Sequence, residues 1–319
     1  MSKYVKFGIK SLLTIVFVWL LVSKIDIYQS MKIALDLPVY KVIFAFILYY
    51  VASISINSLI VLEIAHAKLR NIIQFDKVNI AMRACSLIMP LLIVSALRWK
   101  IYRNMGIGKR NSLSIMLVNR FHQILTSSLF VLIVAPVLLS SYMWKYTVLM
   151  LVAGCLFLMS FVVVLYGINY KSLGDRLLAL SSKVKIIKNR FGGGFSLCRI
   201  SNTRRLIFLL IASVLGSLII ITSQYIVASS FFDVEFFHMV LARSIVQILL
   251  VLPITIGGLG VREIGFASVL SLFGYDGESV IAFTLVLLSF QVFLFVLGLV
   301  VYFFDRDTFH IQRARQEVI

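Results

Sequence analysis

Apolar runs of about 20 residues recur along this chain, and no other feature constrains its fold as strongly. Six runs are long enough to cross a bilayer as single helices: residues 7–23, 42–64, 112–139, 146–167, 206–228 and 280–304. Of the 319 residues, 61% are hydrophobic and 14% are charged, whereas about 25% are charged in a typical soluble domain. The sequence therefore predicts an all-α polytopic membrane protein, with residues 1–319 forming a single integral membrane domain.

The net charge of +18 is spread between the apolar runs and does not form one compact basic surface. Loops 98–111 and 168–205 are rich in Lys and Arg, whereas loops 229–238 and 274–279 contain acids and no Lys or Arg. Basic loops of membrane proteins face the cytoplasm, so this pattern indicates topology and attraction to anionic lipid, and no nucleic-acid partner is expected. Both termini are predicted to be cytoplasmic. The predicted parts are a first half (1–167), a cytoplasmic basic loop (168–205), a second half (206–304) and a cytoplasmic tail (305–319).

Two more apolar stretches, residues 78–97 and 237–273, do not fit as simple spans. If the first crossed fully, the basic loop after it would be external, and the acidic loops on both sides of the second place its two ends outside. The part of the second stretch that follows Gly260, residues 261–273, is about 20 Å long as a helix, shorter than the roughly 30 Å hydrocarbon core. We therefore predict two re-entrant or broken helical elements that enter from opposite faces.

The two re-entrant elements also resemble each other in sequence. The first reads "IMPLLIVSALRW" and the second "VLPITIGGLGVRE", and each has a proline followed eight or nine residues later by an arginine. Interrupted segments in corresponding halves point to the binding site of a transporter, and opposite entry makes such a repeat inverted. The similarity is short, so a chance match and a true inverted repeat both remain open.

The second element contains residues that break a helix and residues that bind anions. The helix-breaking positions are Pro253, Gly257, Gly258 and Gly260. Freed backbone N–H groups and the start of a following helix can bind an anion, and Arg262 adds a fork that suits phosphate. Glu263 falls in the first turn of that helix, where a carboxylate favours the helix dipole. The alternative is a structural turn in which Arg262 and Glu263 lie at an interface.

Three other arginines are candidates for the same site. Arg120 lies about 12 Å into the span 112–139 and shares a helix face with Gln123, and Arg243 precedes Pro253. Charged residues inside membrane segments indicate function, although Arg98 and Arg120 have an alternative role as interfacial residues. Single polar residues within spans are more typical of interhelical hydrogen bonds. These are Asn57, Gln224 and Gln291.

The sequence offers no positive support for catalysis. Its four histidines and three cysteines show no metal-ligand spacing, and no nucleophile elbow, P-loop or dinucleotide fingerprint is present. No catalytic residue, metal or cofactor is therefore predicted. A membrane-embedded enzyme acting on lipid phosphate remains a third hypothesis, which requires a nucleophile or metal site.

The stretch "LPITIGGLGVREIGFASVLSLFG" resembles the C-terminal signature of the lysylphosphatidylglycerol synthase transmembrane-region family, also described as flippase-like. The signature is a proline, a glycine-rich stretch, Gly-Val-x-Glu and a short helix that ends in glycine. The matching positions are Pro253, Gly257, Gly258, Gly260, Val261, Glu263 and Gly274. "MPLLIVSALRW" is similar to the family's first motif, with Ser95-Ala96 in place of a glycine-acid pair, and "VNRFHQIL" is similar to a third motif, with amides at Asn119 and Gln123 near its acids.

The resemblance implies a multi-pass protein of a bacterial or archaeal cytoplasmic membrane. Some family members are fused to synthase domains and are implicated in flipping the product lipid, and standalone relatives are linked to lipid-linked glycan pathways. The leading hypothesis is a translocase for an anionic or phosphate-bearing lipid or lipid-linked glycan precursor. In it the arginines bind phosphate, and Glu263 balances charge or couples a cation. The alternative is a non-transporting scaffold that binds a glycosyltransferase or lipid-modifying synthase of envelope biogenesis through the basic loop 168–205.

Overall fold

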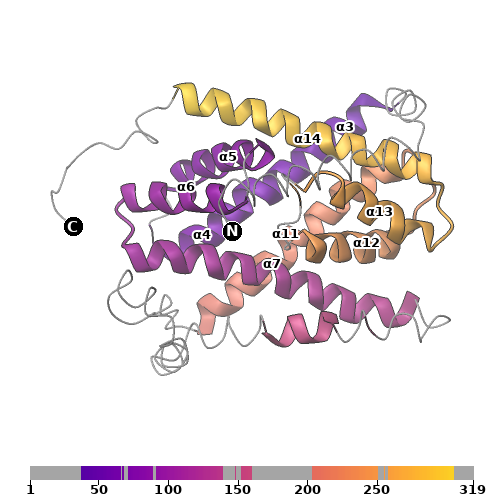
Figure 1. Ribbon diagram of the computed structural model, residues 1–319, viewed down its shortest axis with the longest axis horizontal. Helices are drawn as coiled ribbons and strands as arrows, with labels where there is room; N and C mark the ends of the chain where they lie inside the picture. Colours follow the sequence, from indigo (N-terminus) through magenta and orange to yellow (C-terminus); the bar gives the residue numbers. More distant parts are fainter. Residues whose placement is uncertain are drawn as a thin grey trace, which may run out of the picture.

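The computed structural model describes residues 37–65, 67, 71–88, 91–138, 148, 152–159, 203–250, 255 and 258–304. Every regular element in these ranges is a helix (Figure 1). The predicted span 7–23, most of 146–167, nearly all of the loop 168–205 and the tail 305–319 lie outside the described residues. The fold is that of a polytopic helical membrane protein, as predicted.

The helices of the first half are α3 (Val39–Tyr50), the π-helix η1 (Val51–Ile56), α4 (Asn57–Ala65), α5 (Ile72–Ile88), α6 (Leu91–Asn104) and α7 (Lys109–Leu138). Those of the second half are α11 (Thr203–Ala228), α12 (Phe236–Leu249), α13 (Val261–Ser271) and α14 (Gly277–Phe304). Four helical stretches in the described part of the chain are long and apolar enough to cross a membrane: Val39–Ala65, Asn119–Leu138, Ile207–Ala228 and Gly277–Phe304. They correspond to the predicted spans 42–64, 112–139, 206–228 and 280–304.

The two predicted re-entrant stretches each form a pair of short helices that contact each other, α5 with α6 and α12 with α13. The α5–α6 pair lies toward one end of the molecule's long axis and the α12–α13 pair toward the other (Figure 1). This placement is the one expected for elements that enter from opposite faces. The bounds of the second pair agree with the predicted 237–273, but the first pair extends from Ile72 to Asn104, beyond the predicted 78–97.

The two halves contact each other in a reciprocal way: the contact that the first half makes with the second is matched by an equivalent contact of the second half with the first. Helix α5 of the first half packs along α14 of the second, and α12 of the second half packs along α7 of the first. Each short pair therefore places its first helix against the long helix that follows the other pair, while α3 packs against α11. A chance resemblance between two short segments does not account for this reciprocal pattern, which supports the inverted-repeat interpretation.

Close backbone approach holds these helices together. A Cβ atom at Gly298 of α14 would lie 2.5 Å from the Cβ of Ala84 and 2.9 Å from the carbonyl oxygen of Ile80, so only glycine fits against α5. Ser223 of α11 donates a hydrogen bond of 2.7 Å to the carbonyl oxygen of Ala45 in α3. Small residues and interhelical hydrogen bonds are the usual means of helix association in lipid, where the hydrophobic effect contributes little.

Each end of the molecule has its own apolar core. One core includes Met239, Phe266 and Phe283 of α12–α14, and the other includes Phe75 and Tyr102 of α5 and α6. Large apolar side chains are also exposed on the long helices, as lipid contact requires. Examples are Phe44 on α3, Ile211 on α11 and Phe293 on α14.

Candidate functional site

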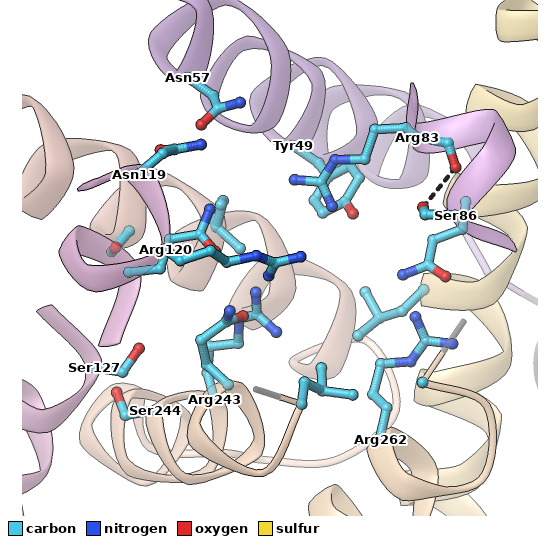
Figure 2. A pocket seen from close by; sticks show the side chains of 18 of the residues that line it. Tyr49, Asn57, Arg83, Ser86, Asn119, Arg120, Ser127, Arg243, Ser244 and Arg262 are labelled. Carbon is cyan, nitrogen blue, oxygen red and sulfur yellow. Dashed lines mark hydrogen bonds between the residues drawn. The ribbon is translucent and has the colours of Figure 1, made fainter. Parts of the chain in front are cut away.

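A cavity of about 450 Å³ lies among the helices, with lining residues from both halves of the chain. Both short helix pairs contribute to its wall, together with α3, α4, α7, α11 and α14. Pockets that bind small molecules have volumes of roughly 300–1,000 Å³, so this cavity is large enough for a ligand of that size. Figure 2 shows its polar lining.

Five arginines line this cavity: Arg83 of α5, Arg98 of α6, Arg120 of α7, Arg243 of α12 and Arg262 of α13. No aspartate or glutamate among the residues that the structure describes lines it with them. Since guanidinium groups stay charged under all physiological conditions, the wall is strongly positive.

Arg83 lies close enough to three other arginines, Arg98, Arg120 and Arg243, to interact electrostatically with each of them. Arg243 lies in turn within electrostatic range of Arg262. The side chains of Arg83, Arg120 and Arg243 point into a common space (Figure 2). Two like charges 4 Å apart repel by about 4 kcal/mol at an effective dielectric constant of 20, so an anion between these groups relieves several repulsions at once.

Arg262 differs from the others because it has a carboxylate partner. Its Nε and Nη2 atoms donate hydrogen bonds of 3.1 and 2.7 Å to Oε1 of Glu263, and both residues are buried, with 4% and 6% of their surfaces exposed. The other oxygen of Glu263 accepts a hydrogen bond of 2.7 Å from the backbone N–H of Gly260, which caps the start of α13. The carboxylate of Glu263 thus accepts a hydrogen bond from the backbone N–H at the start of α13, where the sequence predicted that an external anion would bind.

The turn before α13 requires glycine at two positions. Gly258 and Gly260 have φ angles of +76° and +81°, in the region that other residues rarely adopt. A Cβ atom at Gly258 would also lie 2.6 Å from Cδ2 of Leu250. The predicted helix-breaking role is therefore observed at these two glycines, whereas Pro253 and Gly257 lie outside the described residues.

Residues 8–298 match the family model described as Lysylphosphatidylglycerol synthase TM region. The chain belongs to this family. The resemblance seen in the C-terminal signature is therefore confirmed over most of the chain. Among proteins with curated descriptions, none matches this chain significantly.

Most of the predicted site residues of this family member meet at one place. Six of them line the cavity: Arg98, Arg120, Gln123, Arg243, Gly258 and Arg262. Glu263 and Gly260 are connected to this lining, because Glu263 accepts hydrogen bonds from Arg262 and from the backbone N–H of Gly260. Gln123 faces the cavity together with Arg120, as their spacing on α7 predicts.

Arg83 was not among the predicted site residues; it lies in the first helix of the first pair, α5, as Arg243 lies in the first helix of the second pair, α12. The internal repeat contained the signal, because Arg83 and Arg243 both precede a proline, and Arg98 and Arg262 both follow one. Three residues interpreted as interhelical hydrogen-bonding groups also line the cavity. These are Asn57, Gln224 and Gln291.

Several polar atoms of the cavity wall are buried without a hydrogen-bond partner among the described residues. They are Nε of Arg98, Oε1 of Gln224, Oγ of Ser244 and Oγ1 of Thr255. Unsatisfied buried polar atoms are rare in folded proteins and are usually satisfied by water or a ligand. These atoms mark the cavity as a site for a polar group. In the described part of the chain, no His, Cys, Asp and Glu side chains gather as metal ligands do.

Proposed function

We propose that this family member translocates an anionic or phosphate-bearing lipid, or a lipid-linked glycan precursor, whose headgroup passes through the arginine-lined cavity. The observation that carries this proposal is the convergence of five arginines from both halves on one cavity among membrane-spanning helices. An arginine at the bilayer centre costs roughly 2.5–3.5 kcal/mol on insertion scales. Five arginines that line one cavity among membrane-spanning helices are best explained by an anionic headgroup that they bind.

The positions of the two short helix pairs support movement of the headgroup as well as binding. The pairs reach the cavity from opposite ends of the molecule, and each contributes two of the five arginines. In transporters with inverted repeats, the site lies where broken helices of the two halves meet, and rocking of one half against the other opens it to either side. The exposed apolar surface of the long helices leaves the acyl chains in lipid while the headgroup crosses.

The experiment uses purified protein reconstituted in vesicles that contain a headgroup-labelled phosphatidylglycerol, with a membrane-impermeant quencher to follow translocation. The wild-type protein should translocate the lipid, and Arg120→Gln should slow it about tenfold or more, since a hydrogen bond to a charged group contributes about 1.5–3 kcal/mol. Arg103→Gln is the matched control, because Arg103 is exposed on α6, does not line the cavity and stacks on Trp99 at 5.1 Å. Equal rates in the two variants would contradict the proposal. Vesicles in which the wild-type protein moves neither this lipid nor a labelled polyprenyl diphosphate would favour a scaffold.

A further inference from the structure

We infer that the headgroup bound in this cavity carries more than one negative charge on phosphate, as in a lipid diphosphate or a lipid phosphate monoester. This inference rests on the proposed function and names the substrate class of the same site. A phosphodiester headgroup such as phosphatidylglycerol carries one negative charge. A phosphate monoester carries about 1.5 to 2 at neutral pH, and a diphosphate carries at least two.

The charge of the cavity is the first reason. Five arginines line it, and one of them, Arg262, is paired with the carboxylate of Glu263 at 2.7 Å. None of the other acidic side chains that the structure describes lines the cavity. Four positive charges therefore lack a described carboxylate beside them. A single phosphodiester would leave three of them uncompensated, and a diphosphate leaves fewer.

The distribution of the arginines is the second reason. Arg83 is an electrostatic neighbour of Arg98, Arg120 and Arg243, Arg98 is also a neighbour of Arg120, and Arg243 is a neighbour of Arg262. These neighbours place the arginines in an array that runs from Arg98 and Arg120 through Arg83 and Arg243 to Arg262. The side chains of Arg83, Arg120 and Arg243 face a common space in its middle (Figure 2). An array of this kind can hold two linked phosphates, each contacting different arginines with bidentate geometry.

The two ends of the array differ in the donors that they offer. At one end, Nε of Arg98 is buried without a partner in the described residues, so a phosphate oxygen there gains a hydrogen bond. At the other end, Nε and Nη2 of Arg262 already donate to Glu263. The region between Arg83 and Arg98 is therefore the strongest anion position.

The same charges disfavour a cationic headgroup. A lysylated phospholipid, of the kind that the family description names, has ammonium groups that require carboxylate partners or aromatic faces. Glu263, which contacts the cavity-lining Arg262, is engaged by that arginine and by the backbone of Gly260. The aromatic residues of the lining, Tyr49 and Phe130, share the wall with five arginines whose charges repel an ammonium group. This member is therefore suited to a polyanionic lipid and not to a lysylated one.

The first test measures binding to the full-length protein in an uncharged detergent by calorimetry. The probes are farnesyl diphosphate, farnesyl phosphate, short-chain phosphatidylglycerol, short-chain lysylphosphatidylglycerol and inorganic diphosphate. Farnesyl diphosphate should bind at least tenfold more tightly than phosphatidylglycerol, and lysylphosphatidylglycerol should bind most weakly. Equal affinity for phosphatidylglycerol, or tighter binding of the lysylated lipid, would overturn the inference. Inorganic diphosphate that binds as tightly as farnesyl diphosphate would identify a soluble anion as the ligand and overturn the lipid assignment.

Variants at Arg83 locate the binding. Arg83→Gln should weaken farnesyl diphosphate binding about 10- to 100-fold. Arg83→Lys should weaken it less, because lysine keeps the positive charge and loses only the bidentate guanidinium. Arg103→Gln should leave the affinity unchanged. Equal losses in Arg83→Gln and Arg103→Gln would contradict the assignment. If Arg83→Gln does not fold, the substrate class is still tested by the order in which unlabelled lipids displace farnesyl diphosphate from the wild-type protein.

The proposed translocation and the proposed substrate class are contradicted by different results. Reconstituted wild-type protein that moves labelled phosphatidylglycerol as fast as a labelled polyprenyl diphosphate would leave the translocase in place and remove the polyanionic substrate class. Selective binding of the diphosphate without translocation of any lipid would keep the substrate class and remove the translocase.

Discussion

Glu263→Ala is the substitution that most directly tests how the cavity tolerates its charges. In the folded protein this carboxylate accepts two hydrogen bonds from Arg262, at 2.7 and 3.1 Å, and one of 2.7 Å from the backbone N–H of Gly260. The alanine variant leaves a buried guanidinium without its counter-charge and leaves the start of α13 without its cap. We expect the variant to be markedly less stable than the wild-type protein.

The magnitude follows from these contacts. Removing one partner of a buried ion pair costs about 3–5 kcal/mol, and the loss of a helix cap costs about 0.5–2 kcal/mol. Arg262 also lines the polar cavity, where water or a bound anion solvates it, so the lower end of the range applies. We therefore expect a loss of about 3 kcal/mol in the free energy of unfolding. Adding a phosphate-bearing ligand should restore part of it.

The assay is thermal unfolding in detergent at one fixed scan rate, with Arg262→Met and the Arg262→Met/Glu263→Ala double variant beside it. The double variant should be more stable than Glu263→Ala alone, since removing both partners leaves no unpaired buried charge. Glu235→Ala is the control, because the side chain of Glu235 is 72% exposed and should change stability by no more than about 0.5 kcal/mol. The reasoning is refuted if Glu263→Ala unfolds at the wild-type temperature, or if the two substitutions are simply additive.

Three further substitutions test the packing around the site by the same thermal assay. Gly298→Val should destabilise the protein by about 1–3 kcal/mol, because its side chain overpacks against α5, and an unchanged unfolding temperature would argue against this close approach. Gly258→Ala should cost more than Gly274→Ala: both have positive φ angles, with a cost of about 1–2 kcal/mol, but only the first also meets Leu250 at 2.6 Å. Equal costs would show that Leu250 moves aside freely. Ser223→Ala removes a hydrogen bond to the backbone of α3 and should cost about 0.6 kcal/mol, so a loss above 2 kcal/mol would mean that the hydroxyl has a second role.

Four of the six predicted spans and the two short helix pairs are present in the described residues, and they were predictable because they depend on local properties of the sequence. The length of each apolar run predicted the spans, and the alternation of basic and acidic loops predicted that two stretches return to the face they left. The second pair was placed accurately, since the proline and glycines between α12 and α13 mark the break in the chain itself.

The first pair was underestimated for a physical reason. Helix α5 begins among polar residues that include Asp76 and Lys77, and α6 continues through Lys100 and Arg103. A search for apolar runs stops at these residues, although an α-helix with one polar face continues through them. The extent of this pair therefore depends on helical periodicity as well as on hydrophobicity.

The arginines of the cavity were partly predictable and their convergence was not. Arg120 and Arg243 were predicted as site residues because charges within membrane segments are rare. Asn57, Gln224 and Gln291 could not be assigned to the same cavity, since their meeting depends on packing between segments far apart in the chain. Only the arrangement of α4, α11 and α14 around the cavity shows that these amides belong to one site.

The most direct test of the central claim is the rate at which wild-type protein and Arg243→Gln translocate a headgroup-labelled anionic lipid in otherwise protein-free vesicles. Arg243 lines the cavity and lies within electrostatic range of Arg83 and Arg262, so it links the arginines of the two halves. We expect the wild-type protein to translocate the lipid well above the rate of empty vesicles, and Arg243→Gln to be slower by about tenfold or more. Wild-type vesicles that match empty vesicles, or an Arg243→Gln variant as fast as wild type, would show that the cavity does not carry the headgroup across.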